Sequence, residues 1–121
     1  MAVHFDSSSF GEVVIDGRGY GDVLVVGNEV EERNDLRLNQ ELGSDHLIGE
    51  WEVKKLLSNQ PEIVIIGAGT GGALQVTPEI RKRFKKAKVE LIILTTPRAI
   101  EEYNGLVGMD KKVNALIHST C

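Results

Sequence analysis

Three short, purely apolar runs in the second half of the chain constrain its fold more than any other feature. They cover residues 63–66, 91–94 and 115–117 and consist of Ile, Leu, Val and Ala. Runs of this length, without alternating polar residues, are typical of strands buried on both faces, and such strands are usually parallel and covered by helices. The pattern therefore predicts an α/β fold.

Two helices are predicted between these runs, and both begin with threonine followed by proline. Thr77 and Pro78 open "TPEIRKRFKKAK", and Thr96 and Pro97 open "TPRAIEEYN". Threonine is a good N-cap, and proline fits the first helical position because the N–H that it lacks has no partner within the helix. The predicted order is β-α-β-α-β from residue 62 to the C-terminus. Right-handed crossovers would make the three strands parallel neighbours in one sheet.

The first third of the chain predicts β-structure. In "FGEVVIDGRGY", alternating residues lead to Asp16 and Gly17. This pair favours a two-residue hairpin turn because both central positions need a positive φ. Residues 23–26 are predicted to be the return strand, followed by an edge strand near Val30 and a polar loop. A helix with one buried stripe is predicted over residues 47–57.

The stretch "GAGTGG" directly after the first apolar run contains Gly67-x-Gly69-x-x-Gly72. A dinucleotide fingerprint also needs a helix N-terminus at once after the glycines, and an acidic residue about 20 positions on at the end of the next strand. Here the helix start lies five residues after Gly72, and the next strand ends with Thr95 and Thr96. We therefore set dinucleotide binding aside. Two interpretations stay open: glycines that only shape the loop, and a nest of backbone N–H groups that binds an anion or phosphate.

The carboxyl ends of parallel strands share one edge of a sheet, and ligands of open α/β sheets bind there. The candidate ligand-binding residues at this edge are Gly67, Gly69, Thr70, Gly71, Gly72, Thr95, Thr96 and His118. His118 and Cys121 suggest a base and a nucleophile, but a reactive cysteine needs a rigid mount. We favour a hydrogen-bonded His118 that caps the last strand, and we assign no catalytic residue.

Charge and composition exclude nucleic acid and membranes as expected partners. The net charge is −4, so nothing draws the whole chain toward nucleic acid or anionic lipid. The basic stretch 81–88 is interpreted as the solvated face of a helix, because no aromatic residue is interleaved with it to stack on a base. No apolar run is long enough to span a membrane.

His4 and His46 have no partner at ligand spacing, so no metal site and no cofactor are predicted. The chain has one cysteine and begins without a signal peptide, which predicts a cytoplasmic protein. No Pro-, Ser- or Gly-rich linker divides the 121 residues, so a single domain over residues 1–121 is predicted.

Four segments together resemble a known family of domains. They are "FGEVVIDGRGY", "QPEIVIIGAGTGGALQVTPEI", "TPRAIEEYNGLVG" and the final "HSTC". In combination they resemble the adipogenesis-associated Mth-type domain family, which contains uncharacterised archaeal and bacterial proteins and the mitochondrial complex I assembly factor 3. The similarity covers about residues 5–121, and the family's recurrent motifs match residues 67–72, 103–104 and 118–121. It implies a three-layer α/β fold with a mixed central sheet and an extra N-terminal β-hairpin, and it carries no established catalytic residues.

The resemblance and the lack of a catalytic constellation favour a non-enzymatic binding or assembly module, because the mitochondrial relative acts by binding other proteins. The expected partners are therefore other proteins, and no oligomeric state is predicted. The alternative is an anion- or phosphate-binding protein, or an enzyme, with its site at the strand C-terminal ends, so enzymatic activity is left open.

Trp51, the only tryptophan, is interpreted as a residue either of the core or of an interface.

Overall fold

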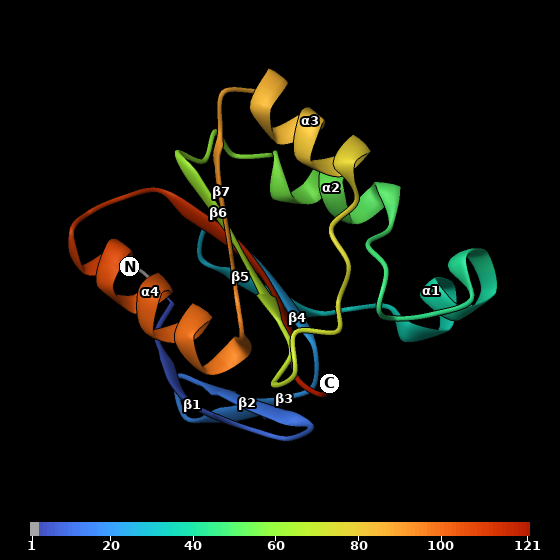
Figure 1. Ribbon diagram of the computed structural model, residues 1–121. Helices are drawn as coiled ribbons and strands as arrows, with labels where there is room; N and C mark the ends of the chain where they lie inside the picture. Colours follow the sequence, from blue (N-terminus) through green and yellow to red (C-terminus); the bar gives the residue numbers. More distant parts are fainter. Residues whose placement is uncertain (1–2) are drawn as a thin grey trace.

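The computed structural model describes residues 3–121, which form two β-sheets and four helices (Figure 1). The larger sheet has five strands in the order β5-β4-β8-β6-β7, and the smaller sheet has three in the order β1-β2-β3. The strands are β1 (Phe5–Ser9), β2 (Glu12–Ile15), β3 (Arg18–Tyr20), β4 (Val23–Val26), β5 (Glu29–Glu32), β6 (Ile63–Ala68), β7 (Glu90–Leu94) and β8 (Val113–His118). The helices are α1 (Asp35–Leu42), α2 (Glu50–Leu56), α3 (Pro78–Lys86) and α4 (Thr96–Gly108).

The five-stranded sheet is mixed. β6 pairs in parallel with both β7 and β8, while β4 pairs antiparallel with β8 and with β5. The order β6-α3-β7-α4-β8 along the chain confirms the predicted unit with three parallel neighbouring strands. Every residue of β6 and β8 is buried, as their nearly continuous apolar sequences lead one to expect.

Helices and the small sheet cover the two faces of the central sheet. Figure 1 shows α2 and α3 together on one face, and α4 with β1-β2-β3 on the other. Val64 and Ile66 of β6 join the core under α2 and α3, whereas Ile65 joins the core that α4 and the small sheet cover. This arrangement confirms the three-layer α/β fold that the resemblance implied.

The predicted N-terminal hairpin is present, but its return strand was assigned wrongly. Asp16 and Gly17 have φ values of 48° and 82°, and they turn the chain between β2 and β3. Residues 23–26 instead form β4, which pairs with β8 and β5 in the central sheet. Residues 23–26 fit the central sheet because a central strand is covered on both faces, and three of the four residues of β4 are buried. β2, by contrast, alternates between exposed and more buried positions.

The segment after β5 contains a helix that the prediction missed. The edge strand expected near Val30 is β5, but residues 35–42, predicted as loop, form α1. Asn34 caps this helix by accepting a hydrogen bond from a backbone N–H of the first turn, and Gly43 ends it at a φ of 78°. Leu38 is the one buried residue of α1, so the apolar stripe that usually reveals a helix is missing.

The helix predicted over residues 47–57 is shorter than expected and forms α2. The backbone oxygens of Asp45 and Leu47 accept hydrogen bonds from the Arg33 side chain, and the chain becomes helical only after them. Within residues 3–121, no helix combines the length and the apolar character that crossing a membrane requires.

Helix α4 fastens the small sheet to the central one. Asn104 Nδ2 donates to the Phe5 oxygen at 2.7 Å, and the Phe5 N–H donates to Asn104 Oδ1 at 3.0 Å. The rings of Phe5 and Tyr103 meet edge to face, with their centroids 5.0 Å apart. The pair Tyr103 and Asn104 therefore joins β1 to the body of the protein.

Replacing Asn104 with Ala should loosen the small sheet more than the central sheet. Both hydrogen bonds to the Phe5 backbone are lost, which costs roughly 1–3 kcal/mol because partly buried backbone groups are left without partners. Amide hydrogen exchange in β1 and β2 should accelerate while exchange in β6 and β8 stays slow. Asn39→Ala, which removes a hydrogen bond to the Asp35 oxygen on the exposed α1, is the control. Equal exchange in β1 and β2 of both variants would contradict the fastening role.

Candidate functional site

The glycine loop closes around the residues that follow β8, and in Figure 1 the C-terminus lies beside this loop. The N–H of Thr70 donates to the Thr120 oxygen at 2.8 Å. The N–H groups of Gly71 and Ala73 donate to the Cys121 backbone oxygen at 2.9 and 3.0 Å. Thr70 Oγ1 also donates to the Thr120 oxygen, at 3.1 Å. The amides that suggested an anion nest therefore hold backbone oxygens of the chain itself.

Thr96, at the start of α4, joins the junction between the glycine loop (residues 67–72) and the residues at the end of β8. Its hydroxyl donates to the His118 oxygen at 2.5 Å and accepts from the Gly69 N–H at 3.0 Å. Its own N–H donates to the Gly69 oxygen at 3.1 Å. Because Thr96 is almost completely buried, a single side chain links the ends of β6 and β8 to α4.

Close packing disfavours a larger residue at two glycine positions of this segment. At Gly67, a Cβ would lie 2.9 Å from the Ile117 side chain. At Gly69, where φ is 96°, a Cβ would lie 2.2 Å from the Cys121 backbone and 2.9 Å from the His118 ring. Gly72 also has a positive φ, 72°, but the space around it is open.

The structure brings most of the predicted ligand-binding residues together at this junction. Thr95 is the exception: it is the exposed N-cap of α4, and within residues 3–121 no hydrogen bond joins it to the glycine loop. The residues that do meet there are Gly67, Gly69, Thr70, Gly71, Gly72, Thr96 and His118. Their role in ligand binding stays a prediction, and an anion would have to displace the oxygens of Thr120 and Cys121.

An aspartate with a nearly buried side chain also holds these residues. Asp22, just before β4, has one oxygen 2.6 Å from His118 Nδ1. Its other oxygen accepts from the Ser119 N–H at 2.6 Å and from the Ser119 hydroxyl at 2.8 Å. Arg33 donates to the first oxygen at 3.2 Å. The His118 side chain is completely buried, and that of Asp22 is only 7% exposed.

These hydrogen bonds fix the ionisation of Asp22 and the tautomer of His118. Burial opposes ionisation of the carboxyl, but the hydrogen bonds from His118 and Ser119 outweigh it and lower the pKa of Asp22 from 3.8 to about 2. An ionised carboxylate only accepts hydrogen bonds, so His118 Nδ1 carries the proton in this pair. In the neutral imidazole, Nε2 is then the acceptor, and it lies 3.2 Å from the Thr120 hydroxyl.

Arg33 extends the network to α2. It is buried and donates to both carboxylate oxygens of Glu52, at 2.7 and 2.9 Å. Burial lowers the pKa of the guanidinium, but the contact with Glu52 outweighs this and raises it. Glu52 also accepts from the Gly49 N–H at 2.9 Å. Across residues 3–121, every buried side-chain N and O atom has a hydrogen-bond partner, so the network is closed.

Asp22, Asp45 and His118 offer ligand atoms that lie within 4.8 Å of one another, the kind of set that can hold a metal ion. Both oxygens of Asp22, however, already accept two hydrogen bonds each, and the Arg33 guanidinium places a positive charge at the same point. This arrangement is better suited to binding the guanidinium than to binding a metal ion.

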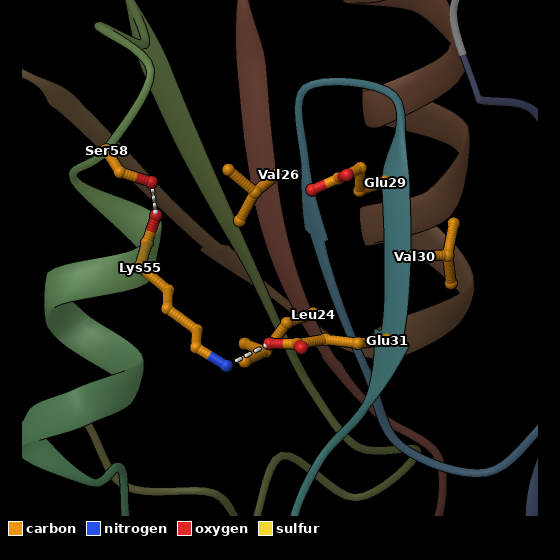
Figure 2. A pocket seen from close by; sticks show the side chains of 7 residues that line it. All are labelled: Leu24, Val26, Glu29, Val30, Glu31, Lys55 and Ser58. Atoms are coloured by element: carbon orange, nitrogen blue, oxygen red, sulfur yellow. Dashed lines mark hydrogen bonds and ion pairs between the residues drawn. The ribbon is translucent and has the colours of Figure 1, made fainter.

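A separate open feature lies between α2 and β5, at the edge of the helical layer. Helix α2 packs against β4 and β8, and β5 lies beside it as the end strand of the sheet. The larger part of this groove, shown in Figure 2, has a volume of about 530 Å³, and a smaller part of about 190 Å³ shares Leu24, Glu31 and Lys55 with it. We call it the α2–β5 groove; its lining residues are Leu24, Val26, Glu29, Val30, Glu31, Glu32, Asn34, Arg37, Trp51, Lys55 and Ser58.

The groove has an apolar floor and charged walls. Leu24 and Val26 of β4 lie at the floor, and in Figure 2 the side chains of Glu29 and Glu31 extend from β5 toward α2. Lys55 Nζ of α2 pairs with Glu31 Oε1 at 2.5 Å, which bridges the two walls.

The far end of the groove contains Trp51. Its ring is half-buried and lies under the Arg37 guanidinium, whose central carbon is 3.9 Å from the ring centroid. Trp51 is not among the residues of either buried core, and its role in an interface stays a prediction.

The chain matches known proteins over nearly its whole length. Residues 5–118 match the model of a family described as "Protein of unknown function (DUF498/DUF598)". The chain belongs to this family. The solved structure of MT938 is 31% identical, with a TM-score of 0.79 over 99% of this chain and 100% of that one. Conserved hypothetical protein PH1505 from Pyrococcus horikoshii OT3 is 28% identical, with a TM-score of 0.85 over 97% of this chain and 98% of that one.

A more distant solved structure shares the fold. A protein of Bordetella pertussis, described as an Mth938-like domain, shares the fold with a TM-score of 0.65 at 12% identity, over 97% of this chain and 85% of that one. Together with the family match, these similarities confirm the expected Mth-type domain family and its α/β fold.

In this DUF498 member, the charged residues that support the junction were not predicted from the sequence. Asp22, Arg33 and Glu52 were not selected, although each is buried or nearly so. One signal was present: Glu52 lies four residues before Leu56 and therefore on the buried face of α2. A charged residue on such a face needs a buried partner of opposite charge.

Gly69→Ala should destabilise this DUF498 domain much more than Gly72→Ala. A side chain at positive φ costs roughly 1–2 kcal/mol, and both positions incur that cost. Only at Gly69 would the new Cβ also meet Cys121 and His118. We expect urea unfolding to show a loss of about 1 kcal/mol for Gly72→Ala and roughly 3 kcal/mol or more for Gly69→Ala. Equal losses would mean that the loop does not press against the residues after β8.

Asp22 should make the stability of the domain fall in acid. Its folded pKa of about 2 lies below the ordinary value of 3.8. The stabilisation is therefore complete above the ordinary pKa and is lost as the pH falls through about 2. It amounts to roughly 2 kcal/mol. Asp22→Asn should remove this part of the pH dependence in urea unfolding between about pH 5 and pH 2, whereas Glu101→Gln on the exposed surface of α4 should keep it. An unchanged acid slope in Asp22→Asn would contradict the assignment.

Proposed function

We propose that this protein is a binding module and that its α2–β5 groove receives a basic, extended segment of another protein. The observation that carries the proposal is an open groove with an apolar floor and an acidic wall, beside the edge strand of the central sheet. This surface supports the predicted binding role and the expectation that the partners are other proteins.

The edge position of β5 supports the binding of an extended segment. β5 pairs with β4 on one side and is the last strand of the sheet on the other. The backbone groups on the outer side of an edge strand can pair with an added strand, and side chains of that strand then enter the neighbouring groove. The floor formed by Leu24 and Val26 would receive apolar side chains of the segment.

The charge of the groove selects a basic segment. Glu29, Glu31 and Glu32 lie along β5 and are exposed. Of these, only Glu31 takes part in an ion pair within residues 3–121, the one with Lys55. Lys or Arg side chains of a partner would therefore meet two unpaired carboxylates, and like charges would repel an acidic partner.

Trp51 and Arg37 supply the residue types that dominate binding energy in protein interfaces. Tryptophan and arginine are enriched among such residues, particularly where a large ring lies in a partly enclosed site. Their stacked arrangement at the end of the groove offers a flat surface for a side chain of the partner. The strand-end junction offers less for an anion, because its amides are bound by the chain itself.

Photo-crosslinking in cells tests this function. A photoreactive residue replaces Ser58, which lines the groove, and in a matched variant it replaces Glu102, which is exposed on α4. We expect the photoreactive residue at position 58 to crosslink to a Lys- or Arg-rich segment of one partner protein, which mass spectrometry locates. The photoreactive residue at position 102 should not crosslink to it.

Charge reversal then separates the groove from general electrostatics. Glu29→Lys with Glu32→Lys should reduce the crosslink roughly tenfold, because each reversal replaces attraction by repulsion. Glu101→Lys with Glu102→Lys changes the net charge equally and should leave it unchanged. Identical crosslinks from positions 58 and 102, or a crosslinked segment that is acidic, would refute the proposal.

A further inference from the structure

We propose that Thr120 is a nucleophile for acyl esters, with His118 as its base, Asp22 as the residue that orients the base, and the Gly71 and Ala73 amides as the site for the carbonyl oxygen. This inference is independent of the α2–β5 groove, because it rests on the junction at the ends of β6 and β8. It concerns a hydroxyl group and not Cys121, which is exposed.

The first support is the line of contacts from Asp22 through His118 to Thr120. Asp22 lies 2.6 Å from Nδ1, and the Thr120 hydroxyl lies 3.2 Å from Nε2. Because the ionised Asp22 keeps the proton on Nδ1, the lone pair of Nε2 is available to the Thr120 hydroxyl. A carboxylate, an imidazole and a hydroxyl in this order are the arrangement that activates a hydroxyl for attack, whatever the fold.

The second support is the rigid mounting of the base. The His118 side chain is completely buried. It meets the His46 ring edge to face, with centroids 5.1 Å apart. Gly69 lies against the other part of the ring, where a Cβ would not fit. Arg33 holds Asp22 in place through a hydrogen bond at 3.2 Å. The imidazole is thereby kept in one orientation before any substrate binds.

The third support is a pair of amides directed at one oxygen. The N–H groups of Gly71 and Ala73 both donate to the Cys121 backbone oxygen, at 2.9 and 3.0 Å. Two backbone donors that converge on one carbonyl oxygen form the arrangement that stabilises the oxyanion in acyl transfer. Here the Cys121 oxygen takes the place of a substrate carbonyl oxygen, one residue after the Thr120 hydroxyl. Cys121 is exposed and Thr120 is half-buried, and an ester that binds here must displace the Cys121 oxygen from these two amides.

The reaction follows from these positions. Thr120 Oγ1 forms a bond to the carbonyl carbon of the ester while its proton moves to His118 Nε2. The oxyanion is held by the two amides, and the intermediate then breaks the bond to the alcohol oxygen, which takes the proton from Nε2 and leaves. Water next attacks the acyl-Thr120 with His118 again as base, which releases the carboxylic acid and restores the hydroxyl.

A fluorophosphonate tests the activated hydroxyl directly, because it reacts with such groups through loss of fluoride and leaves a stable adduct. We expect wild-type protein to gain one adduct, located on Thr120 by mass spectrometry. Thr120→Val should gain none there or elsewhere. Ser9→Ala is the matched control, since it removes an exposed hydroxyl on β1 outside the junction, and it should be labelled like the wild type. His118→Gln should be labelled about 100-fold more slowly.

The tautomer of His118 provides a second measurement that does not depend on reactivity. ¹⁵N-edited NMR of the ring should show the proton on Nδ1 in the wild type and a mixture of tautomers in Asp22→Asn, which would mark Asp22 as the positioning residue. The proposal is overturned if folded wild-type protein gains no adduct on Thr120, if Thr120→Val is labelled as fast as the wild type, or if Nε2 carries the proton in the wild type. Should His118→Gln fail to fold, Thr120→Val and Ser9→Ala decide the matter.

Discussion

The carboxylate of Asp22 connects parts of the chain that lie far apart in sequence. Through His118 and Ser119 it holds the end of β8, and through Arg33 it holds the segment between β5 and α1. Arg33 in turn binds Glu52 of α2. Because these charges are buried, removing any one leaves the others without compensation, and this costs far more than the loss of a surface ion pair. The loops around the strand ends therefore keep one shape although they contain few apolar residues.

The core of the fold could be predicted from local patterns, whereas its edges could not. The runs that became β6, β7 and β8 are apolar throughout, and the Thr-Pro pairs mark where α3 and α4 begin. Burial and capping are local properties, so the sequence shows them directly. Which sheet β4 joins is not a local property, because its partner β8 lies about 90 residues further along the chain. Helix α1 depends on a single buried leucine and two caps, which is too little for an apolar period.

The candidate site, too, could be predicted from the sequence only in part. The glycines and Thr96 stood out because a loop after a buried strand and a helix cap both have sequence signatures. What the loop contacts was not visible, since the oxygens of Thr120 and Cys121 are backbone groups that any residue carries. Arg33 appeared to be an ordinary charged residue of a polar stretch, and Asp22 a charged residue at the start of an apolar strand. Each of them can be buried because the other compensates its charge, and such a pair produces no periodic pattern in the sequence.

The position of β8 affects how the protein folds while it is being synthesised. β8 follows the other strands along the described chain, yet it lies in the middle of the five-stranded sheet, between β4 and β6. Until residues 113–118 leave the ribosome, only the pairs β4-β5 and β6-β7 of this sheet can form, and each presents an apolar edge to the gap between them. Joining them brings together residues from opposite ends of the chain, which slows folding. The nascent chain is therefore most exposed to aggregation just before its main sheet closes from the centre.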